Sequence, residues 1–168
     1  MEVMPYTLIF QEKTIDVDNA EWHGDFRRTD GNSPLKKSSY KLLYTPGGVW
    51  VGIRCDISGQ KMPSEAEAHA RKAYQSECVD LMLSPSESAE TYRHFVVNLY
   101  NIRHARICEP GGVIGKDGEL LWESAVHRGD GFWSVEIRIP YSSLGIFGPE
   151  SIWRLNIGRE NHAAGEAS

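Results

Sequence analysis

This sequence of 168 residues has few cysteines, no excess of basic charge and no long apolar run. Its three cysteines, Cys55, Cys78 and Cys108, cannot all pair, and none lies in a C-x-x-C spacing, so we expect buried thiols, with one disulfide as the alternative. A net charge of -5 argues against a nucleic acid as partner. Because no stretch approaches the roughly 18 apolar residues of a membrane span and no basic leader precedes an apolar run, we expect a chain that neither spans a membrane nor directs its own export.

Motifs that carry catalysis are also missing. The sequence has no G-x-S-x-G elbow, P-loop, H-E-x-x-H pair or dinucleotide fingerprint, and its six histidines lack metal-ligand spacing. The run Asp16-Val-Asp18-Asn19 resembles the start of a calcium loop, but Glu21 and Arg27 stand where an EF-hand needs glycine and glutamate. We therefore predict no catalytic residue and no metal ligand, and a looser structural calcium site at this run stays an alternative.

Short alternating segments are what the sequence does contain. In residues 133–139 apolar and polar side chains alternate, Asp130-Gly131 before them is a turn signal, and Pro140 after them removes a backbone donor. Comparable segments separated by Gly, Pro and Ser predict an all-β fold, a jelly-roll-like antiparallel β-sandwich. These further segments are residues 41–44, 49–55, 78–83, 92–100, 120–126 and 152–158.

One segment breaks the alternation. Residues 63–75 are rich in helix formers and begin with Ser64 and Glu67 in capping-box spacing, which predicts a short inserted helix. No repeat or shift in composition marks a second domain, so we expect residues 1–168 to form one domain.

The order of the strands resembles that of the family 9 carbohydrate-binding modules. The resemblance covers residues 20–161 and is strongest over residues 40–161. Its most specific part is residues 128–148, RGDGFWSVEIRIPYSSLGIFG, which overlap the segment WESAVHRGDGFWSVEIRIPYSSLG and match a "G-W-x-V-E-hydrophobic-x-I-P-hydrophobic-x-x-L-G" strand. The other matching segments are LLYTPGGVWVGIRC, ECVDLMLSP, YRHFVVN and WRLNIGREN.

The sequence departs from the family pattern at three places. The entrance "I-D-G-x-L-D-D-x-x-W" is reduced to residues 14–22, and Glu77-Cys-Val-Asp80 replaces Asp-Ser-Val-Glu while keeping both acids. Family members also continue past the last strand into a loop with an aromatic residue and a closing strand. The resemblance thus implies that half of an aromatic sugar clamp lies outside this sequence, which ends at Ser168.

The resemblance implies a non-catalytic domain that captures a saccharide and serves a glycan-degrading protein, extracellular or periplasmic if its parent protein is secreted. It places an aromatic platform near Tyr74, which would stack on the apolar face of a sugar ring while carboxylates, amides and arginines select its hydroxyl groups. Each of these side chains has an ordinary structural role as an alternative, such as an ion pair between Asp80 and Arg159. The predicted ligand-binding residues are Tyr74, Glu77, Asp80, Asn98, Arg159 and Asn161.

Three alternatives stay open. Trp22 or Trp50 is a rival platform if exposed, whereas the other three tryptophans are expected in the core. Related sandwich domains bind haem through methionine and histidine, and Met82 and His94 lie on neighbouring predicted strands. A third alternative is a ligand-free spacer or interaction module whose partners are other domains of a larger enzyme.

Overall fold

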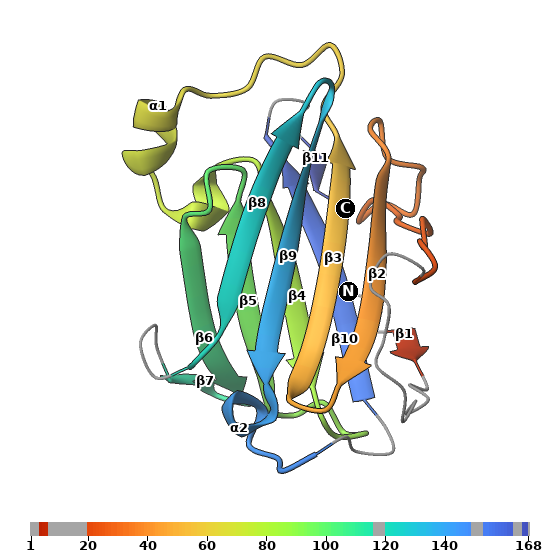
Figure 1. The fold of residues 1–168 in the computed structure, drawn as a ribbon, viewed down its shortest axis with the longest axis vertical. Helices are drawn as coiled ribbons and strands as arrows, with labels where there is room; N and C mark the ends of the chain where they lie inside the picture. Colours follow the sequence, from red (N-terminus) through yellow and green to blue (C-terminus); the bar gives the residue numbers. More distant parts are fainter. Residues whose placement is uncertain (1–3, 7–19, 116–119, 149–152, 163–165, 168) are drawn as a thin grey trace.

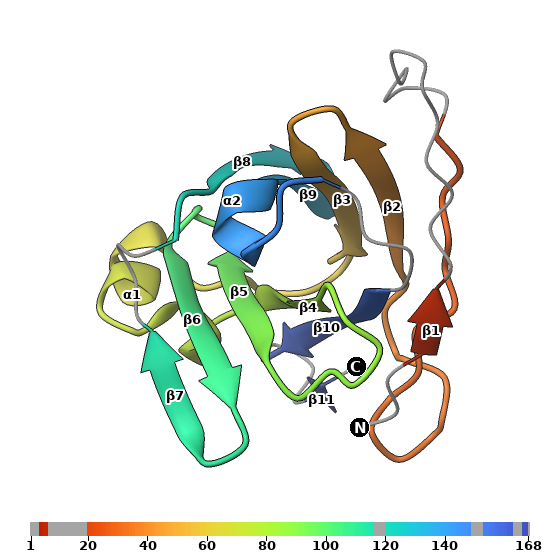
Figure 2. The same cartoon turned by 90° about the horizontal axis from the view of Figure 1, so that it is seen from below.

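Two antiparallel sheets pack face to face in the computed structural model, which describes residues 4–6, 20–115, 120–148, 153–162 and 166–167 (Figures 1 and 2). The larger sheet has the strand order β1-β10-β4-β5-β6-β7, with β11 also paired to β10, and the smaller sheet has the order β2-β3-β9-β8. This confirms the predicted all-β sandwich. The strands are β1 (Met4–Tyr6), β2 (Ser38–Thr45), β3 (Gly48–Asp56), β4 (Cys78–Ser84), β5 (Tyr92–Asn98), β6 (Arg103–Glu109), β7 (Gly112–Gly115), β8 (Glu123–Gly129), β9 (Phe132–Pro140), β10 (Trp153–Asn161) and β11 (Glu166–Ala167).

The core lies between the two sheets and follows from the alternation in the sequence. Strand β9 turns its apolar residues inward, where Trp133 and Ile137 have no exposed surface, and its partner β3 does the same with Val51 and Ile53. Strands β4, β5 and β10 of the larger sheet supply the opposing layer, including Phe95. Because each strand buries alternate residues, every strand also presents a second face, and the outer faces of the two sheets are where polar side chains collect.

The predicted helix over residues 63–75 is two shorter pieces. Helix α1 (Glu65–His69) begins at the predicted capping box, in which Ser64 and Glu67 satisfy each other's backbone N–H groups. It ends at Ala70, and a separate 3-10 turn, η2 (Ala73–Gln75), follows. The break places η2 on the outer face of the larger sheet, where Ala73 packs on Val96.

Strand β9 ends as its proline requires. Pro140 precedes helix α2 (Tyr141–Leu144), and the C-cap residue Gly145 that follows the helix has φ 76°, a conformation that glycine adopts without strain. Figure 2 shows α2 between the two layers at one end of the sandwich. The Ser143 hydroxyl donates to the carbonyl of Leu121 at 2.6 Å, which ties this end to the segment before β8.

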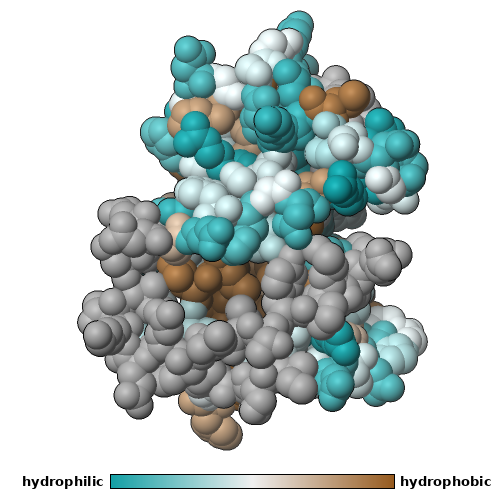
Figure 3. Space-filling model, turned by 90° about the vertical axis from the view of Figure 1, so that its right-hand side faces the viewer, coloured by the Kyte–Doolittle hydropathy of each residue, from teal (hydrophilic) through white to brown (hydrophobic). Residues whose placement is uncertain are grey.

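We call the opposite end, where β3 ends and β9 begins, the tip. It is the upper end in Figure 1, and the loop of residues 20–37 before β2 lies beside it. Seen from the side of β1 and β2, the described surface around this loop is largely hydrophilic, with a hydrophobic hollow farther down next to residues outside the described ranges (Figure 3). No helix in the described part of the chain is long and apolar enough to cross a membrane.

Candidate functional site

The six predicted ligand-binding residues lie in three different places. Tyr74 and Asp80 belong to the outer face of the larger sheet, and Asn98 is the buried last residue of β5, next to the turn that leads to β6. The other three are buried between the sheets near the tip, with at most 1% of their surface exposed. These three are Glu77, Arg159 and Asn161.

A hydrogen-bonded relay occupies the centre of the larger sheet's outer face. His94 Nε2 lies 2.6 Å from Asp80 Oδ1, and Arg106 Nε donates to His94 Nδ1 at 3.0 Å. The arginine donor at Nδ1 assigns the remaining proton to Nε2, which therefore donates to the carboxylate. With each member held by the next, the three side chains form a fixed row of donors and acceptors across β4, β5 and β6.

An exposed aromatic ring stands beside this relay. Tyr74 of η2 is 40% exposed, and its ring packs edge-on against His104 with centroids 6.1 Å apart. His104 pairs with Val96, which pairs with Asp80, so two strand spacings of about 4.8 Å place Asp80 about 10 Å from His104. We define the outer patch as Tyr74, Asp80, His94, His104 and Arg106.

Strand β10 borders the outer patch with a second carboxylate. Gly158 pairs with Asp80 and Glu160 pairs with Cys78, so the carboxylates of Asp80 and Glu160 are diagonal neighbours. Partial burial and the nearby Asp80 charge raise the pKa of the Glu160 carboxyl above its ordinary value.

The relay speaks against the haem alternative. Met82 and His94 are direct cross-strand partners on the outer face, as the sequence suggested. However, both ring nitrogens of His94 already have partners in Asp80 and Arg106. A haem iron would have to displace one of these hydrogen bonds.

The buried residues near the tip form a link between the two sheets. Arg159 Nε donates to Glu77 Oε1 at 2.8 Å, and Trp133 Nε1 donates to the same oxygen at 3.2 Å. The guanidinium then reaches the smaller sheet, where it donates to the carbonyl of Asp56 at 2.9 Å and to Ser38 Oγ at 3.3 Å. The position of Arg159 supports an architectural role for its pair with Glu77. A ligand has no direct access to these two side chains, because each is only 1% exposed.

Asn98 and Asn161 also have partners inside the protein. The Asn98 side-chain oxygen accepts hydrogen bonds from the backbone N–H groups of Tyr100 and Ile102, and so closes the turn between β5 and β6. Asn161 Oδ1 accepts from Gln60 Nε2 at 3.3 Å. Only Tyr74 and Asp80 of the predicted set reach the surface at a common place.

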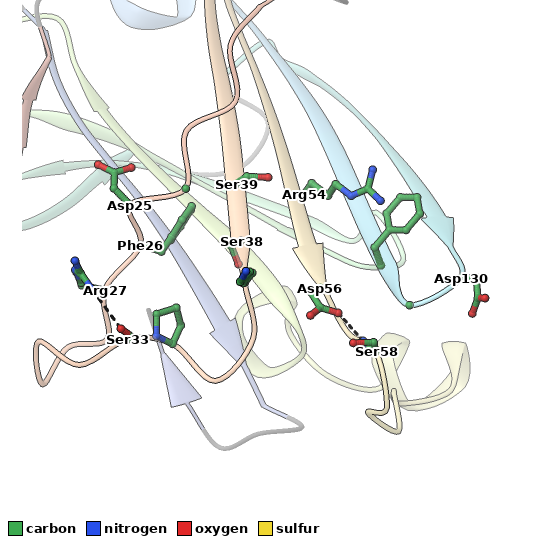
Figure 4. A pocket seen from close by; sticks show the side chains of 15 residues that line it. Asp25, Phe26, Arg27, Ser33, Ser38, Ser39, Arg54, Asp56, Ser58 and Asp130 are labelled. Carbon is green, nitrogen blue, oxygen red and sulfur yellow. Dashed lines mark hydrogen bonds between the residues drawn. The ribbon is translucent and has the colours of Figure 1, made fainter.

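A pocket of about 660 Å³, called the tip pocket, lies at the tip next to the outer face of the smaller sheet. Figure 4 shows Asp25, Phe26, Arg27 and Ser33 of the loop on one side of it and Asp56, Ser58 and Asp130 on the other. Hydrogen bonds from Ser58 lower the pKa of the Asp56 carboxyl below its ordinary value. The charged lining residues are Asp25, Asp56, Asp130, Arg27, Lys37 and Arg54.

The buried pair and the tip pocket are connected through the backbone. Arg159 donates to the carbonyl of Asp56 and, at 3.4 Å, to the carbonyl of Lys37, and both of these residues line the pocket. Arg159 thus holds the pocket floor in place from the interior. Sequence reasoning found the arginine and missed the pocket, because the loop of residues 24–34 that forms one wall carries no periodic signal.

The structure also separates the two candidate tryptophans. Trp50 is only 5% exposed and its indole lies over Gly52, whereas Trp22 is 45% exposed. Trp133 and Trp153 are buried in the core, as predicted, and Trp122 packs against its edge.

The three cysteines are buried and free, which confirms the prediction of unpaired thiols. Residues 16–19, with the calcium alternative, lie outside the described residues.

Comparisons with known proteins place the fold. No family model and no curated protein sequence matches the chain. A family 9 carbohydrate-binding module from Caldicellulosiruptor kristjanssonii, solved with cellotriose, matches with a TM-score of 0.64 and 14% identity over 97% of this chain and 77% of that one. A module of the same description from that organism, solved with glucose, gives a TM-score of 0.60 and 13% identity over 93% and 75%.

A third solved structure gives the same picture. It is a Bacteroides uniformis protein provisionally described as carbohydrate-binding, with a TM-score of 0.64 and 11% identity over 84% of this chain and 72% of that one. The predicted resemblance to family 9 modules is therefore confirmed at the level of the fold, which is what identities of 11–14% carry.

Proposed function

We propose that this domain binds a saccharide without catalysing a reaction on it, and that the outer patch contacts the sugar. The observation that carries the proposal is the shared fold with a module solved with cellotriose and with glucose, combined with an exposed tyrosine beside a fixed polar relay. Service to a glycan-degrading protein outside the cell or in the periplasm is the biological setting that we propose for it.

The chemistry of the outer patch suits a pyranose. A sugar ring offers an apolar C–H face and a belt of hydroxyl groups that both donate and accept. The Tyr74 ring supplies a flat apolar surface, and Asp80 supplies an acceptor whose orientation is set by His94. A preorganised acceptor costs little entropy on binding and rejects a sugar whose hydroxyl group points elsewhere.

The first experiment is a saccharide titration of the isotope-labelled domain followed by amide NMR signals, with thermal unfolding in parallel. D-glucose, D-galactose, D-mannose, D-xylose and cellotriose form the panel. We expect one of them to shift signals of residues 74–82 and 94–106, and at about 100 times its Kd to stabilise the fold by about 2.7 kcal/mol. Tyr74→Ala should remove these shifts with an almost unchanged Tm, because the ring is 40% exposed.

Phe147→Ala is the matched control. Phe147 is a fully exposed aromatic residue that follows α2, at the other end of the sandwich. Its removal should leave the titration unchanged, which distinguishes a specific binding site from non-specific binding to an exposed aromatic ring. Shifts at residues 74–82 that persist in Tyr74→Ala would refute the assigned platform, and the absence of any response to the whole panel would favour the spacer alternative.

A further inference from the structure

The exposed tryptophan lies on the outer face of the smaller sheet. Lys41 of β2 points to this face, because its neighbours Tyr40 and Leu42 pack in the core, and its ammonium group lies 4.7 Å from the centre of the Trp22 ring. Lys41 itself is only 7% exposed. The ammonium group of Lys41 thus contacts one face of the indole, while 45% of the Trp22 surface is exposed to solvent.

A second planar group lies one step away along the same strands. The Arg54 guanidinium sits 3.6 Å from the centre of the Phe132 ring, and both residues line the tip pocket (Figure 4). Ser39 lines the tip pocket, pairs with Arg54 and lies two residues before Lys41, so the pocket wall at Ser39 and the lysine that contacts Trp22 are about 7 Å apart along β2. Stacking fixes the plane of the guanidinium, and no described carboxylate pairs with it.

The charges of the tip pocket decide what kind of ligand it suits. Three carboxylates and three basic side chains line it, together with four serines, so it has no net attraction for either an anion or a cation. Donors and acceptors placed side by side suit groups that donate and accept at once, which is the property of a hydroxyl group. The volume of about 660 Å³ lies within the range of small-molecule sites.

From these observations we infer that the tip pocket and Trp22 form a second saccharide-binding surface for a neutral sugar. Trp22 is the platform for the C–H face, and Arg54, held on Phe132, donates to hydroxyl oxygens. This surface lies on the smaller sheet and the outer patch on the larger, so the two face opposite sides of the sandwich. The domain is then bivalent, a property that the proposed function does not contain, although the inference shares its ligand class.

The test uses the same NMR titration of the whole chain, with D-glucose, D-galactose, D-mannose, D-xylose and cellotriose as probes. We expect the indole N–H signal of Trp22 and the amides of residues 54–58 and 130–132 to shift with at least one probe. Both sets of shifts should persist in Tyr74→Ala, and those of the amides should disappear in Trp22→Ala. Trp22→Phe, which keeps a ring, should weaken binding at this surface by less than Trp22→Ala does.

Arg54→Lys provides a second variant that keeps the charge and the exposed position. Lysine cannot present the planar fork that stacks on Phe132, so we expect the Kd at this surface to rise at least tenfold with an unchanged Tm. Phe147→Ala should change nothing.

The two sites can fail separately. Shifts confined to residues 74–106 would overturn the second surface and leave the proposed function in place. Shifts confined to Trp22 and the tip pocket would support the second surface and refute the outer patch. Silence at both sites with every probe would overturn both, and an unchanged response of the tip pocket in Trp22→Ala would refute the platform.

Discussion

Two carboxylates on one face of the larger sheet make a single residue, Glu160, sensitive to pH. Burial and the Asp80 charge raise the pKa of the Glu160 carboxyl, so the folded protein holds this proton more tightly than the unfolded chain. From the ordinary glutamate value of 4.5 upward, the free energy of unfolding therefore falls as pH rises through the raised pKa. Below pH 4.5 the full contribution of the Glu160 proton to the free energy of unfolding is present.

Glu160→Gln removes this proton-linked contribution. We expect the variant to exceed the wild type in free energy of unfolding by about 0.2–1 kcal/mol at pH 7, since burial disfavours the charged carboxylate and like charges on neighbouring strands repel, and to match it near pH 4. Urea unfolding at the two pH values measures this. In an Asp80→Asn background the gain should shrink, because part of the repulsion is already gone. A gain of equal size at both pH values would contradict the explanation.

Sequence reasoning could reach those residues of the outer patch whose face follows from the alternation of their strand. Alternation assigns Asp80 and His94 to an outward face, so their meeting on adjacent strands follows from the strand order. The burial of Glu77 and Arg159 does not follow, because both carry charge and only the tertiary pairing across the two sheets makes their burial tolerable. Trp22 was ambiguous because no periodic pattern surrounds it.

At the level of elements, the hairpin between β2 and β3 depends on close contact with β9. A Cβ atom at Gly48 would lie 2.1 Å from the carbonyl oxygen of Ile139, whereas one at Gly47 would meet nothing within 4 Å. Backbone on the neighbouring strand cannot yield as a flexible side chain can. Glycine at position 48 is therefore a packing requirement of the smaller sheet.

Gly48→Ala and Gly47→Ala form a matched pair one residue apart. We expect Gly48→Ala to lower the free energy of unfolding by about 1–3 kcal/mol, the usual cost of overpacking, and Gly47→Ala to leave it within about 0.5 kcal/mol. Chemical denaturation of both variants gives the comparison. Equal stabilities would show that β3 and β9 separate more easily than their pairing indicates.

Strands with strong alternation, such as β3 and β9, were predictable because one face of each is entirely apolar. Strand β6 was not predicted: its sequence, RHARICE, is largely polar, and it is a strand because β5 pairs with it through the turn closed by Asn98. Strand β7, with the sequence GVIG, was not predicted either, because it is short and begins and ends with glycine. In both cases pairing with a neighbour overrides a weak local preference.

At the scale of the whole molecule, one interior arginine joins the two sheets. The Arg159 side chain extends from β10 of the larger sheet, pairs with Glu77 and donates to the backbone carbonyl of Asp56, a residue of the smaller sheet that lines the tip pocket. The outer patch, by contrast, belongs to the larger sheet alone. Saccharide binding at the tip pocket should therefore depend on the packing of the two sheets, and binding at the outer patch on the pairing of β4, β5 and β6.

The buried thiols test how cooperative the sandwich is. Cys55 lies in the main core with no exposed surface, and burial raises the pKa of its thiol to about 12, so labelling needs the core to open. Cys78 is equally buried, but it lies on the outer side of the larger sheet beneath η2, packed with Ala73 and Val96. Opening of η2 alone should release Cys78, whereas Cys55 requires separation of the sheets.

We therefore expect iodoacetamide to label Cys78 faster than Cys55 in native buffer, followed by peptide mass spectrometry. The labelling rate of Cys55 should rise steeply with urea, with the slope of global unfolding, while that of Cys78 should depend on urea only weakly. Reducing agent should leave Tm unchanged, because all three thiols are free. Equal rates and slopes for the two cysteines would mean that η2 unfolds only with the whole domain, and that Tyr74 is then held as rigidly as the core beneath it.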